Sequence, residues 1–357
     1  MCTEYKNNPI SPINVDIQDR VKERWANKVK PEFSLGYLEE IVTHLALITG
    51  GIDVTLTNPN LLLFAGDHHI TQEGVSNSAP EITYQQVINF SKGGGAVGLL
   101  AKENNINLKV VDCGVNYDFD PSLDIINKKV GYGAANFLSL KAMSEEDALL
   151  AMENGKSLID TLVKENCNVV LFGEMGIGNT TSASAITSSL LNLDASLCTS
   201  QGAGLFDWQI EHKIEVIKKG QLFHGKESSP ISILSTYGGY EIATMVGSLL
   251  EAAHKKMVII IDGFVTSCAL LVASFIDKEV TSYVLASHVG KEKGHQVILD
   301  YLHLRSVLNL DLSLGEGSGA LLCYPIVTQA LHLYQKMESF SEANVTNSVQ
   351  EMKKRSR

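Results

Sequence analysis

Short continuous apolar runs recur along the chain, and each ends near a small or acidic residue and a glycine-containing turn. The six runs are 61–69 (LLLFAGDHH), 108–115 (LKVVDCGV), 169–178 (VVLFGEMGIG), 231–239 (ISILSTYGG), 257–264 (MVIIIDGF) and 282–290 (SYVLASHVG). Runs without apolar/polar alternation are typical of strands that are buried on both faces of a sheet. The pattern therefore predicts a parallel sheet covered by helices.

The segments that follow three of these runs have helical character. They are residues 181–191, 240–256 and 265–276. This alternation predicts a doubly wound, Rossmann-like α/β domain over residues 55–324, with a mostly parallel sheet of about six strands. Ligands of such domains bind beyond the carboxyl ends of the strands. The polar residues expected at those ends are Asp67, Asp112, Glu174, Asp262 and His288.

Both ends of the chain show a different, purely helical pattern. Residues 17–50 contain two amphipathic helical stretches before the first apolar run, and residues 325–354 are again helical in pattern. We therefore expect a small helical lobe, built from residues 1–54 and 325–357, that packs on the α/β domain.

Composition narrows the class of protein. Of the 357 residues, 45% are hydrophobic and 19% are charged, and the net charge of −11 argues against a nucleic-acid partner. No signal peptide is visible, and no apolar stretch approaches the roughly 20 residues that span a bilayer, so a cytoplasmic protein without a membrane partner is expected. The six cysteines show no Cys-x-x-Cys spacing and are expected to be buried, reduced thiols: Cys2, Cys113, Cys167, Cys198, Cys268 and Cys323.

The stretch 172–181 (FGEMGIGNTT) has the glycine spacing of a phosphate loop without its lysine. Gly173 and Gly178 keep the Walker A spacing, but Asn179 and Thr180 stand where an NTPase has Lys and then Ser or Thr. A glycine-rich turn that opens a helix still presents backbone N–H groups to an anion. The stretch favours a single-phosphate nucleotide over ATP with Mg²⁺. The alternative is a tight strand-to-helix connection without a ligand.

The stretch 312–322 (LSLGEGSGALL) carries one acid between glycines. Glu316 lies between Gly315 and Gly317, which allows the backbone to approach a ligand while the carboxylate is presented to it. Such an acid is a candidate general base. The alternative is that Glu316 only caps the helix that follows.

The long polar segment 66–101 follows the first apolar run and is typical of a binding loop. Its Asp67-His68-His69 sequence raises the possibility of a metal site, but no further acids or histidines follow at a recognisable spacing. His288 and His295 match no zinc motif either. Nucleophile-elbow and dinucleotide motifs are also missing from the sequence, so no metal and no cofactor are expected.

Together these stretches resemble the nicotinate-nucleotide–dimethylbenzimidazole phosphoribosyltransferase family, which works in assembly of the cobalamin lower ligand. The resemblance begins at KPEFSLGYLE (30–39) and ends at LGEGSGA (314–320). Between them, in family order, come FAGDHHIT, EGVSNSAPEITYQQVINFSKGGGAVGLLA, VVDCGV, GEMGIGNTTSASAI, GGYEIATMVGSLLEAA, IIDGFVTSCALL and ASHVGKEKGHQVILDYL.

The resemblance implies a reaction. Members transfer 5-phosphoribose from nicotinate mononucleotide to 5,6-dimethylbenzimidazole or a related base, which gives α-ribazole 5′-phosphate and nicotinate. Nicotinate leaves as a good leaving group from a cationic pyridinium, so no metal and no Walker lysine are implied. Members are homodimers, and the same is implied here.

The resemblance also implies roles for individual residues. Glu316 matches the catalytic base that takes the benzimidazole proton, and Glu174 matches a second active-site acid. The positions that match the ribose and phosphate site are Gly176, Gly178, Asn179, Thr180, Gly202, Gly204 and Lys213. The positions that match the base slot are Ser76, Gln85, Met175 and Leu314.

The chain departs from the family pattern at His69, at Ala203 and at Phe33. Family members commonly have glycine, threonine and a small residue at these positions. The departures concern base preference and phosphate contacts and leave the reaction type unchanged. Two other functions stay open from the sequence: a transferase of the same fold with another acceptor, such as a purine or a phenolic base, and a non-catalytic mononucleotide sensor. A P-loop-like ATPase is disfavoured by Asn179.

Overall fold

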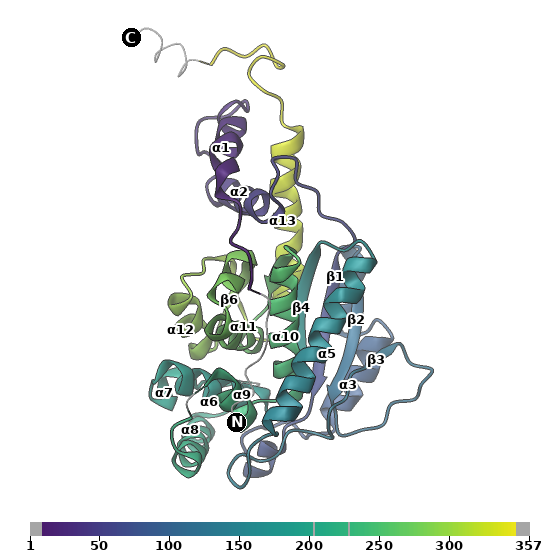
Figure 1. Cartoon of the computed structure of the whole chain (residues 1–357), viewed down its shortest axis with the longest axis vertical. Coiled ribbons are helices and arrows are strands. Elements are labelled where there is room, and N and C mark those ends of the chain that lie inside the picture. The colour runs from purple at the N-terminus through teal and green to yellow at the C-terminus, as the bar shows by residue number, and fades with distance from the viewer. Residues whose placement is uncertain (1–8, 203, 228, 348–357) are drawn as a thin grey trace. The chain divides into compact units, whose positions relative to one another are not determined.

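Seven parallel strands form one sheet within residues 9–202, 204–227 and 229–347, which are the residues that the computed structural model of the chain describes (Figure 1). The strands are β1 (Asn60–Gly66), β2 (Asn107–Gly114), β3 (Ile125–Asn127), β4 (Val169–Met175), β5 (Val258–Ile261), β6 (Val284–Gly290) and β7 (Ser306–Leu312). Their order in the sheet is β3-β2-β1-β4-β5-β6-β7. The chain therefore winds outward from β1 in one direction and from β4 in the other, as in Rossmann-like folds. The predicted α/β class is confirmed, with seven strands in place of about six.

The central strands β1 and β5 are buried along their whole length, and β4 is buried except at the half-buried Glu174. Every residue of β1 and of β5 is buried, which explains their continuous apolar sequences. The rings of Phe64 on β1 and Phe172 on β4 stack with 5.6 Å between their centroids. The parallel register pairs Phe64 with Glu174 and Ala65 with Met175. This register sets Glu174 at the carboxyl end of β4, where the topology reverses.

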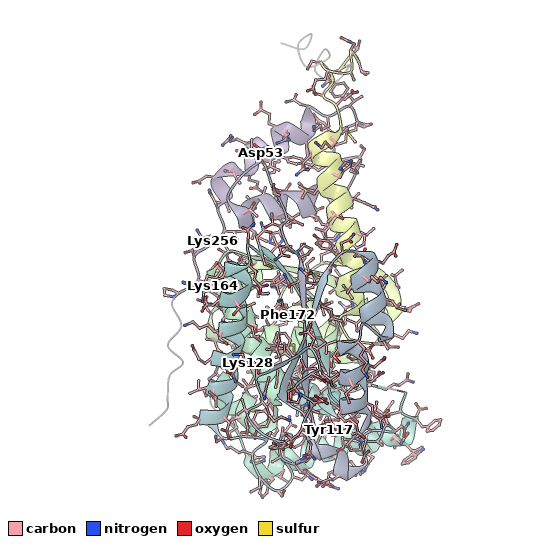
Figure 2. All side chains as sticks on the ribbon, turned by 90° about the vertical axis from the view of Figure 1, so that its right-hand side faces the viewer. Asp53, Tyr117, Lys128, Lys164, Phe172 and Lys256 are labelled. Atoms are coloured by element: carbon pink, nitrogen blue, oxygen red, sulfur yellow. The ribbon has the colours of Figure 1, made fainter. Side chains whose placement is uncertain are left out.

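Helices cover both faces of the sheet. The helices of the described residues, in both parts of the chain, are α1 (Gln18–Ala26), α2 (Tyr37–Thr49), α3 (Ile82–Ser91), α4 (Gly95–Glu103), α5 (Glu145–Lys164), α6 (Asn179–Leu191), α7 (Ala195–Cys198), α8 (Asp207–His224), α9 (Pro230–Tyr237), α10 (Tyr240–His254), α11 (Phe264–Ile276), α12 (Lys293–Tyr301) and α13 (Ser318–Lys336), with 3-10 turns η1 (Val15–Ile17), η2 (His69–Glu73) and η3 (Lys278–Tyr283). In Figure 2, Phe172 lies between α5, which ends at the labelled Lys164, and the helices α3 and α4 on the other side. Helix α10 packs on α5 and contacts β1, β2, β4 and β5.

One predicted strand is wrong. The apolar run 231–239 forms helix α9 instead of a strand. Pro230 stands in the first turn of that helix, and the Ser229 hydroxyl accepts a hydrogen bond from the Ser232 N–H at 3.0 Å. Proline in the first turn after a serine cap is a helix-start signal, and a short apolar run alone cannot distinguish a buried strand from a buried helix.

Two strands at the sheet edges were missed. β3 has only three residues, and β7 is half-buried to exposed along its length. Edge strands need not be continuously apolar, so the pattern did not reveal them. The C-terminal helix also differs from the expectation of 325–354: α13 begins at Ser318 and ends at Lys336, and residues after 347 lie outside the described part.

The described chain divides into two compact units. The larger one contains residues 9–12 and Leu56–Cys323, and the smaller one contains Ile13–Thr55 and residues 324–347. The expectation assigned all of residues 1–54 to the lobe. Residues 9–12 instead belong to the larger unit, because the Ile10 N–H donates to Asp277 at 2.9 Å and the Tyr283 hydroxyl donates to the Ser11 carbonyl at 2.6 Å.

Both ends of the chain meet inside the smaller unit. The rings of Trp25 and Tyr334 lie 4.9 Å apart, and the Arg24 guanidinium lies over the Tyr334 ring. The Gln335 side chain donates to the Val54 carbonyl at 2.6 Å. Phe33, one of the departures from the family pattern, belongs to this unit, where its side chain is exposed.

Five of the six cysteines lie in described positions. Cys113, Cys167, Cys198, Cys268 and Cys323 are all buried free thiols, as predicted. Cys2 and Ala203 lie outside the described residues. Among the helices in the described ranges, none combines the length and the apolar character that crossing a membrane requires.

Candidate active site

A cavity of about 370 Å³ opens beyond the carboxyl ends of the central strands in the larger unit. Its wall is formed by four segments that end or follow strands: 174–180 at β4, 263–265 after β5, 290–292 at the end of β6, and 312–316 at the end of β7. Residues 75–77 and two residues of α3 also contribute, and the wall is completed by Gly202, Leu205, Lys213, His288 and His295. This is the position at which doubly wound sheets bind ligands.

The glycine-rich loop after β4 leads directly into helix α6. Gly178 precedes the first helical residue with a φ of +97°, a conformation that L side chains rarely adopt. A Cβ at this position would lie 2.9 Å from the Thr71 methyl group. The Ile177 N–H donates to the Thr83 hydroxyl at 3.1 Å, which fixes the loop to α3. The loop therefore directs the amino end of α6 into the cavity, where backbone N–H groups favour an anion.

A buried cation lies beside this loop. Lys213 on α8 is only 1% exposed, and its ammonium donates to the Thr180 hydroxyl at 2.8 Å. Burial lowers the pKa of Lys213 to about 8, and the charge of Glu292 opposes this in part. The Glu292 carboxylate accepts a hydrogen bond from the Ser200 hydroxyl. A buried ammonium that keeps donors free beside a helix amino terminus is well suited to a phosphate.

Glu174 is the first of two acids on the cavity wall. Its carboxyl accepts a hydrogen bond from the Asn179 side-chain amide. Burial and then the charge of Asp262 raise the pKa of Glu174 to about 8, against the opposing effect of the Asn179 hydrogen bond. Glu174 is therefore mostly protonated at neutral pH and can donate a hydrogen bond to a ligand.

Glu316 is the second acid and lies in the turn before α13. Its φ is +60°, which is uncommon for a residue with a side chain. Its side chain is 9% exposed, and burial raises its pKa, followed by the charge of Asp262. A base whose pKa is raised toward neutral pH suits general-base catalysis.

Two glycines bring the acids to the same cavity. A Cβ on Gly173 would lie 2.9 Å from the backbone nitrogen of Gly317, and a Cβ on Gly317 would lie 2.7 Å from a Leu61 methyl group. The turn before α13 therefore touches the backbone of β4 directly, one residue before Glu174. This close approach places the Glu316 and Glu174 side chains on one wall.

Eleven of the thirteen residues predicted for the site line this cavity: Ser76, Glu174, Met175, Gly176, Gly178, Asn179, Thr180, Gly202, Lys213, Leu314 and Glu316. Gln85 does not, because its side chain is exposed on α3, whereas the next residue, Gln86, lies on the wall. Gly204 is also absent from it and lines a neighbouring cavity of about 420 Å³ that shares Gly202 and Glu292.

Several wall residues were not among the predicted site residues, although the strand-end rule had marked one of them. His288 and His295 line the cavity with their rings 5.6 Å apart, and burial lowers the pKa of His295 to about 3. Phe264 and Val265 add apolar surface. The strand-end rule had already marked His288, and it could have marked Phe264, which follows β5 after only two residues.

Asp67 and His68 are part of the buried interior, and His69 is half-buried. His68 contacts Glu241 at 2.6 Å through Nε2 and Ser182 at 2.9 Å through Nδ1. Asp67 accepts a hydrogen bond from the Asn116 N–H at 2.8 Å, and a Cβ on Gly133 would meet the His69 ring. In the part of the chain that the structure describes, no group of three or more His, Cys, Asp and Glu side chains is arranged to hold a metal ion.

Comparison with known proteins identifies the family of the chain. A family model described as phosphoribosyltransferase matches residues 10–345. A nicotinate-nucleotide–dimethylbenzimidazole phosphoribosyltransferase of Photobacterium profundum is 39% identical over 329 residues, covering 92% of this chain and 96% of that protein. The enzyme of the same name from Phocaeicola vulgatus is 39% identical over 341 residues, covering 96% of this chain and 99% of that protein.

Solved structures give the same result. The crystal structure of CobT from Thermus thermophilus matches with a TM-score of 0.89 and 31% identity, over 93% of this chain and 99% of that chain. A second structure, of the nicotinate-nucleotide–dimethylbenzimidazole phosphoribosyltransferase from the same organism, matches with a TM-score of 0.88 and 30% identity, over 94% of this chain and 100% of that chain. The chain therefore belongs to the nicotinate-nucleotide–dimethylbenzimidazole phosphoribosyltransferase family.

Proposed function

We propose that this chain transfers 5-phosphoribose from nicotinate mononucleotide to 5,6-dimethylbenzimidazole or a related base, and so forms α-ribazole 5′-phosphate and nicotinate. The observation that carries the proposal is the shared cavity: an anion site at one part of its wall and the Glu316 carboxyl at another. Relatives that carry this activity in their names match almost the whole chain.

The phosphate is assigned to the loop 176–180 and Lys213. The loop offers backbone N–H groups at the start of α6, Thr180 offers a hydroxyl, and Lys213 offers a buried positive charge. One phosphate monoester needs no Mg²⁺ bridge and no Walker lysine. Lys213 supplies the positive charge from another helix, which accounts for Asn179 in the lysine position of the loop.

The base is assigned to the apolar part of the wall. Met175, Leu314, Phe264 and Val265 supply flat or aliphatic surface, and Ser76 supplies a polar group. Such a mixture suits a planar aromatic base that must be held in one orientation.

Glu316 is assigned the role of general base. Its carboxylate takes the N–H proton of the benzimidazole, and the electron pair of the other ring nitrogen forms the new bond to C1′ of the ribose. The bond from C1′ to the pyridinium nitrogen breaks, and its electron pair leaves with nicotinate as the ring loses its positive charge. Attack from the face opposite the leaving group inverts C1′. Glu174 keeps its proton at neutral pH and can donate a hydrogen bond to a ligand in the same cavity. Its hydrogen bond with the Asn179 amide holds the carboxyl group in place.

A homodimer and a cytoplasmic location belong to this proposal through the resemblance to the family. A different acceptor base is the main alternative within the same chemistry, because apolar side chains on the wall do not by themselves distinguish one flat heterocycle from another.

The test incubates purified protein with nicotinate mononucleotide and 5,6-dimethylbenzimidazole and follows nicotinate and the riboside phosphate by chromatography. Equal amounts of both products are expected. Nicotinate without the riboside would mean that water is the acceptor and that the base assignment is wrong. Binding of the nucleotide without any turnover would refute the enzyme and support a mononucleotide sensor.

A further inference from the structure

Asp262 makes an unusual set of contacts just behind the cavity wall. It directly follows β5, and its side chain is 1% exposed. One carboxylate oxygen accepts hydrogen bonds from the N–H groups of Gly319 at 2.7 Å and Ala320 at 3.1 Å. The other accepts from the N–H of Gly317 at 3.1 Å. A single carboxylate therefore binds three backbone groups of the segment that carries Glu316.

These three groups belong to a strained turn and to the start of α13. Gly315, Glu316 and Gly317 all have positive φ values, of +80°, +60° and +78°. A positive φ is easy for glycine but costs a residue such as glutamate free energy, so the surrounding contacts must stabilise it. The N–H groups in the first turn of a helix have no partner within the helix, and an acid that accepts from them also interacts favourably with the helix dipole. For α13 this acid is Asp262, which comes from the loop after β5 and not from the residues next to the helix in sequence.

We propose that Asp262 is the positioning residue for Glu316: its carboxylate holds the turn 315–320 in the shape that presents the Glu316 carboxyl to the cavity. This inference rests on the proposed role of Glu316 as the base. Asp262 itself is not assigned a contact with substrate, since it acts through the backbone of the turn.

The contacts around Asp262 also hold the start of α13 in place. Its carboxylate lies 3.9 Å from Nδ1 of His288 on β6, and the Ser287 hydroxyl donates to the Asp262 carbonyl at 3.2 Å. A Cβ on Gly319 would lie 2.0 Å from that His288 nitrogen and 2.9 Å from the Asp262 carboxylate. The start of α13 is therefore held between the end of β5 and the end of β6, with no room for a side chain at Gly319.

The charge of Asp262 also reaches the base. It raises the pKa of Glu316, after the larger effect of burial. The other ionisable groups on the same wall are Glu174 on β4, Lys213 on α8, His288 on β6, Lys291 and Glu292 after β6, and His295 on α12. Removal of the Asp262 charge leaves these groups in place and lowers the pKa of Glu316. Because the base works in its ionised form, the acidic limb of the kcat profile then moves to lower pH.

The experiment compares Asp262→Asn with the matched control Asp277→Asn. Asp277 also accepts two backbone hydrogen bonds, from Ile10 and Glu279, but lies away from the cavity wall. Asparagine keeps the size of Asp262 but turns one acceptor oxygen into a donor that faces backbone N–H groups. We expect kcat to fall on the order of 10²-fold through misplacement of the base, with KM for nicotinate mononucleotide unchanged and the acidic limb moved to lower pH. The control is expected to lose thermal stability and keep the wild-type kcat and pH profile.

A wild-type kcat together with an unchanged acidic limb of the kcat–pH profile in folded Asp262→Asn protein would overturn the proposal. A normal kcat per folded molecule with only a lower Tm would also overturn it, since Asp262 would then be a structural residue. If Asp262→Asn does not fold, Asp262→Ser tests the same point with an uncharged hydroxyl, and failure of both to fold would make Asp262 a folding residue and refute a separate positioning role. Glu316→Gln tests the proposed base separately from the positioning role of Asp262. If Glu316→Gln keeps the full rate, the proposed base is wrong whatever the result for Asp262→Asn.

Discussion

Glutamine at position 316 would keep the size of the side chain and remove its ability to take a proton. Glu316 is 9% exposed and lies in a turn with a φ of +60°, held by three hydrogen bonds from the turn to Asp262. None of these bonds uses the Glu316 side chain. The substitution is therefore expected to leave the turn and the cavity unchanged and to act on the proton transfer alone.

The size of the effect follows from the chemistry of the two bases. A positioned general base contributes about 10²- to 10⁴-fold, and the nicotinate of a pyridinium leaves without acid assistance. The whole contribution of Glu316 is then the removal of the proton from the acceptor base. We expect kcat to fall by about 10³-fold, which corresponds to about 4 kcal/mol of transition-state stabilisation. KM for nicotinate mononucleotide is expected to stay within about twofold, because the loop 176–180 and Lys213 are untouched.

The assay measures initial rates of riboside phosphate formation with each substrate varied, and nucleotide binding by calorimetry. Glu211→Gln is the matched control, since Glu211 is an exposed glutamate on α8 that does not line the cavity. The control is expected to have wild-type rates. A Glu316→Gln enzyme that retains more than about a tenth of the wild-type kcat would refute the reasoning, because a general base contributes more than that. A large rise in KM for the nucleotide would refute the separation of the base from the phosphate site.

Three further substitutions test other parts of the site. Lys213→Met removes the buried cation, so KM for nicotinate mononucleotide should rise on the order of 10²-fold with little change in kcat. In the wild type, KM should also rise above pH about 8, where Lys213 of the free enzyme loses its charge. Initial-rate measurements across pH should show that the variant lacks this rise. Glu174→Gln should flatten the pH dependence of Tm. The pKa of Glu174 is raised from 4.5 to about 8 on folding, so the wild type should lose stability as pH rises through that window. An equally steep decline of Tm in the variant would show that Glu174 is not the cause of the wild-type decline. Gly178→Ala places a Cβ at a φ of +97° and 2.9 Å from the Thr71 methyl group, and calorimetry should show a loss of about 2 kcal/mol together with weaker nucleotide binding. An unchanged Tm would mean that the loop relaxes at no cost.

The central part of the fold could be predicted because strands buried on both faces have continuous apolar sequences. β1 and β5 fit that rule along their whole length. The edge strand β7 could not be found by the same rule, since all of its residues are half-buried or exposed. The run 231–239 satisfied the rule but formed a helix, because the Ser229 cap and Pro230 decide the conformation locally.

The site was predictable where residues close in sequence act together. The loop 173–180 carries its own glycine spacing, and the strand-end rule marked Glu174, Asp262 and His288. Contacts between distant segments could not be derived in this way: Lys213 meets Thr180 only because α8 packs beside α6, and Asp262 meets residues 317–320 only because β5 ends beside α13. The choice between Gln85 and Gln86 depends on helix rotation, since neighbouring residues on a helix point about 100° apart.

The distribution of protons among three neighbouring acids connects the site to the proposed reaction. Burial raises the pKa of Glu174, Asp262 and Glu316, and the charge of Asp262 raises the pKa of both glutamates further, so ionisation of one acid disfavours ionisation of its neighbours. Burial raises the pKa of Asp262, but three backbone N–H groups and His288 oppose that rise, whereas Glu174 has the Asn179 amide alone as a hydrogen-bond donor against it. These contacts favour a negative charge on Asp262 next to the turn, whereas the raised pKa of Glu174, about 8, keeps the proton on Glu174 at neutral pH. That charge favours the cationic substrate and the positive charge that develops at C1′ as nicotinate leaves, and it keeps Glu316 basic enough to accept the proton from the incoming base.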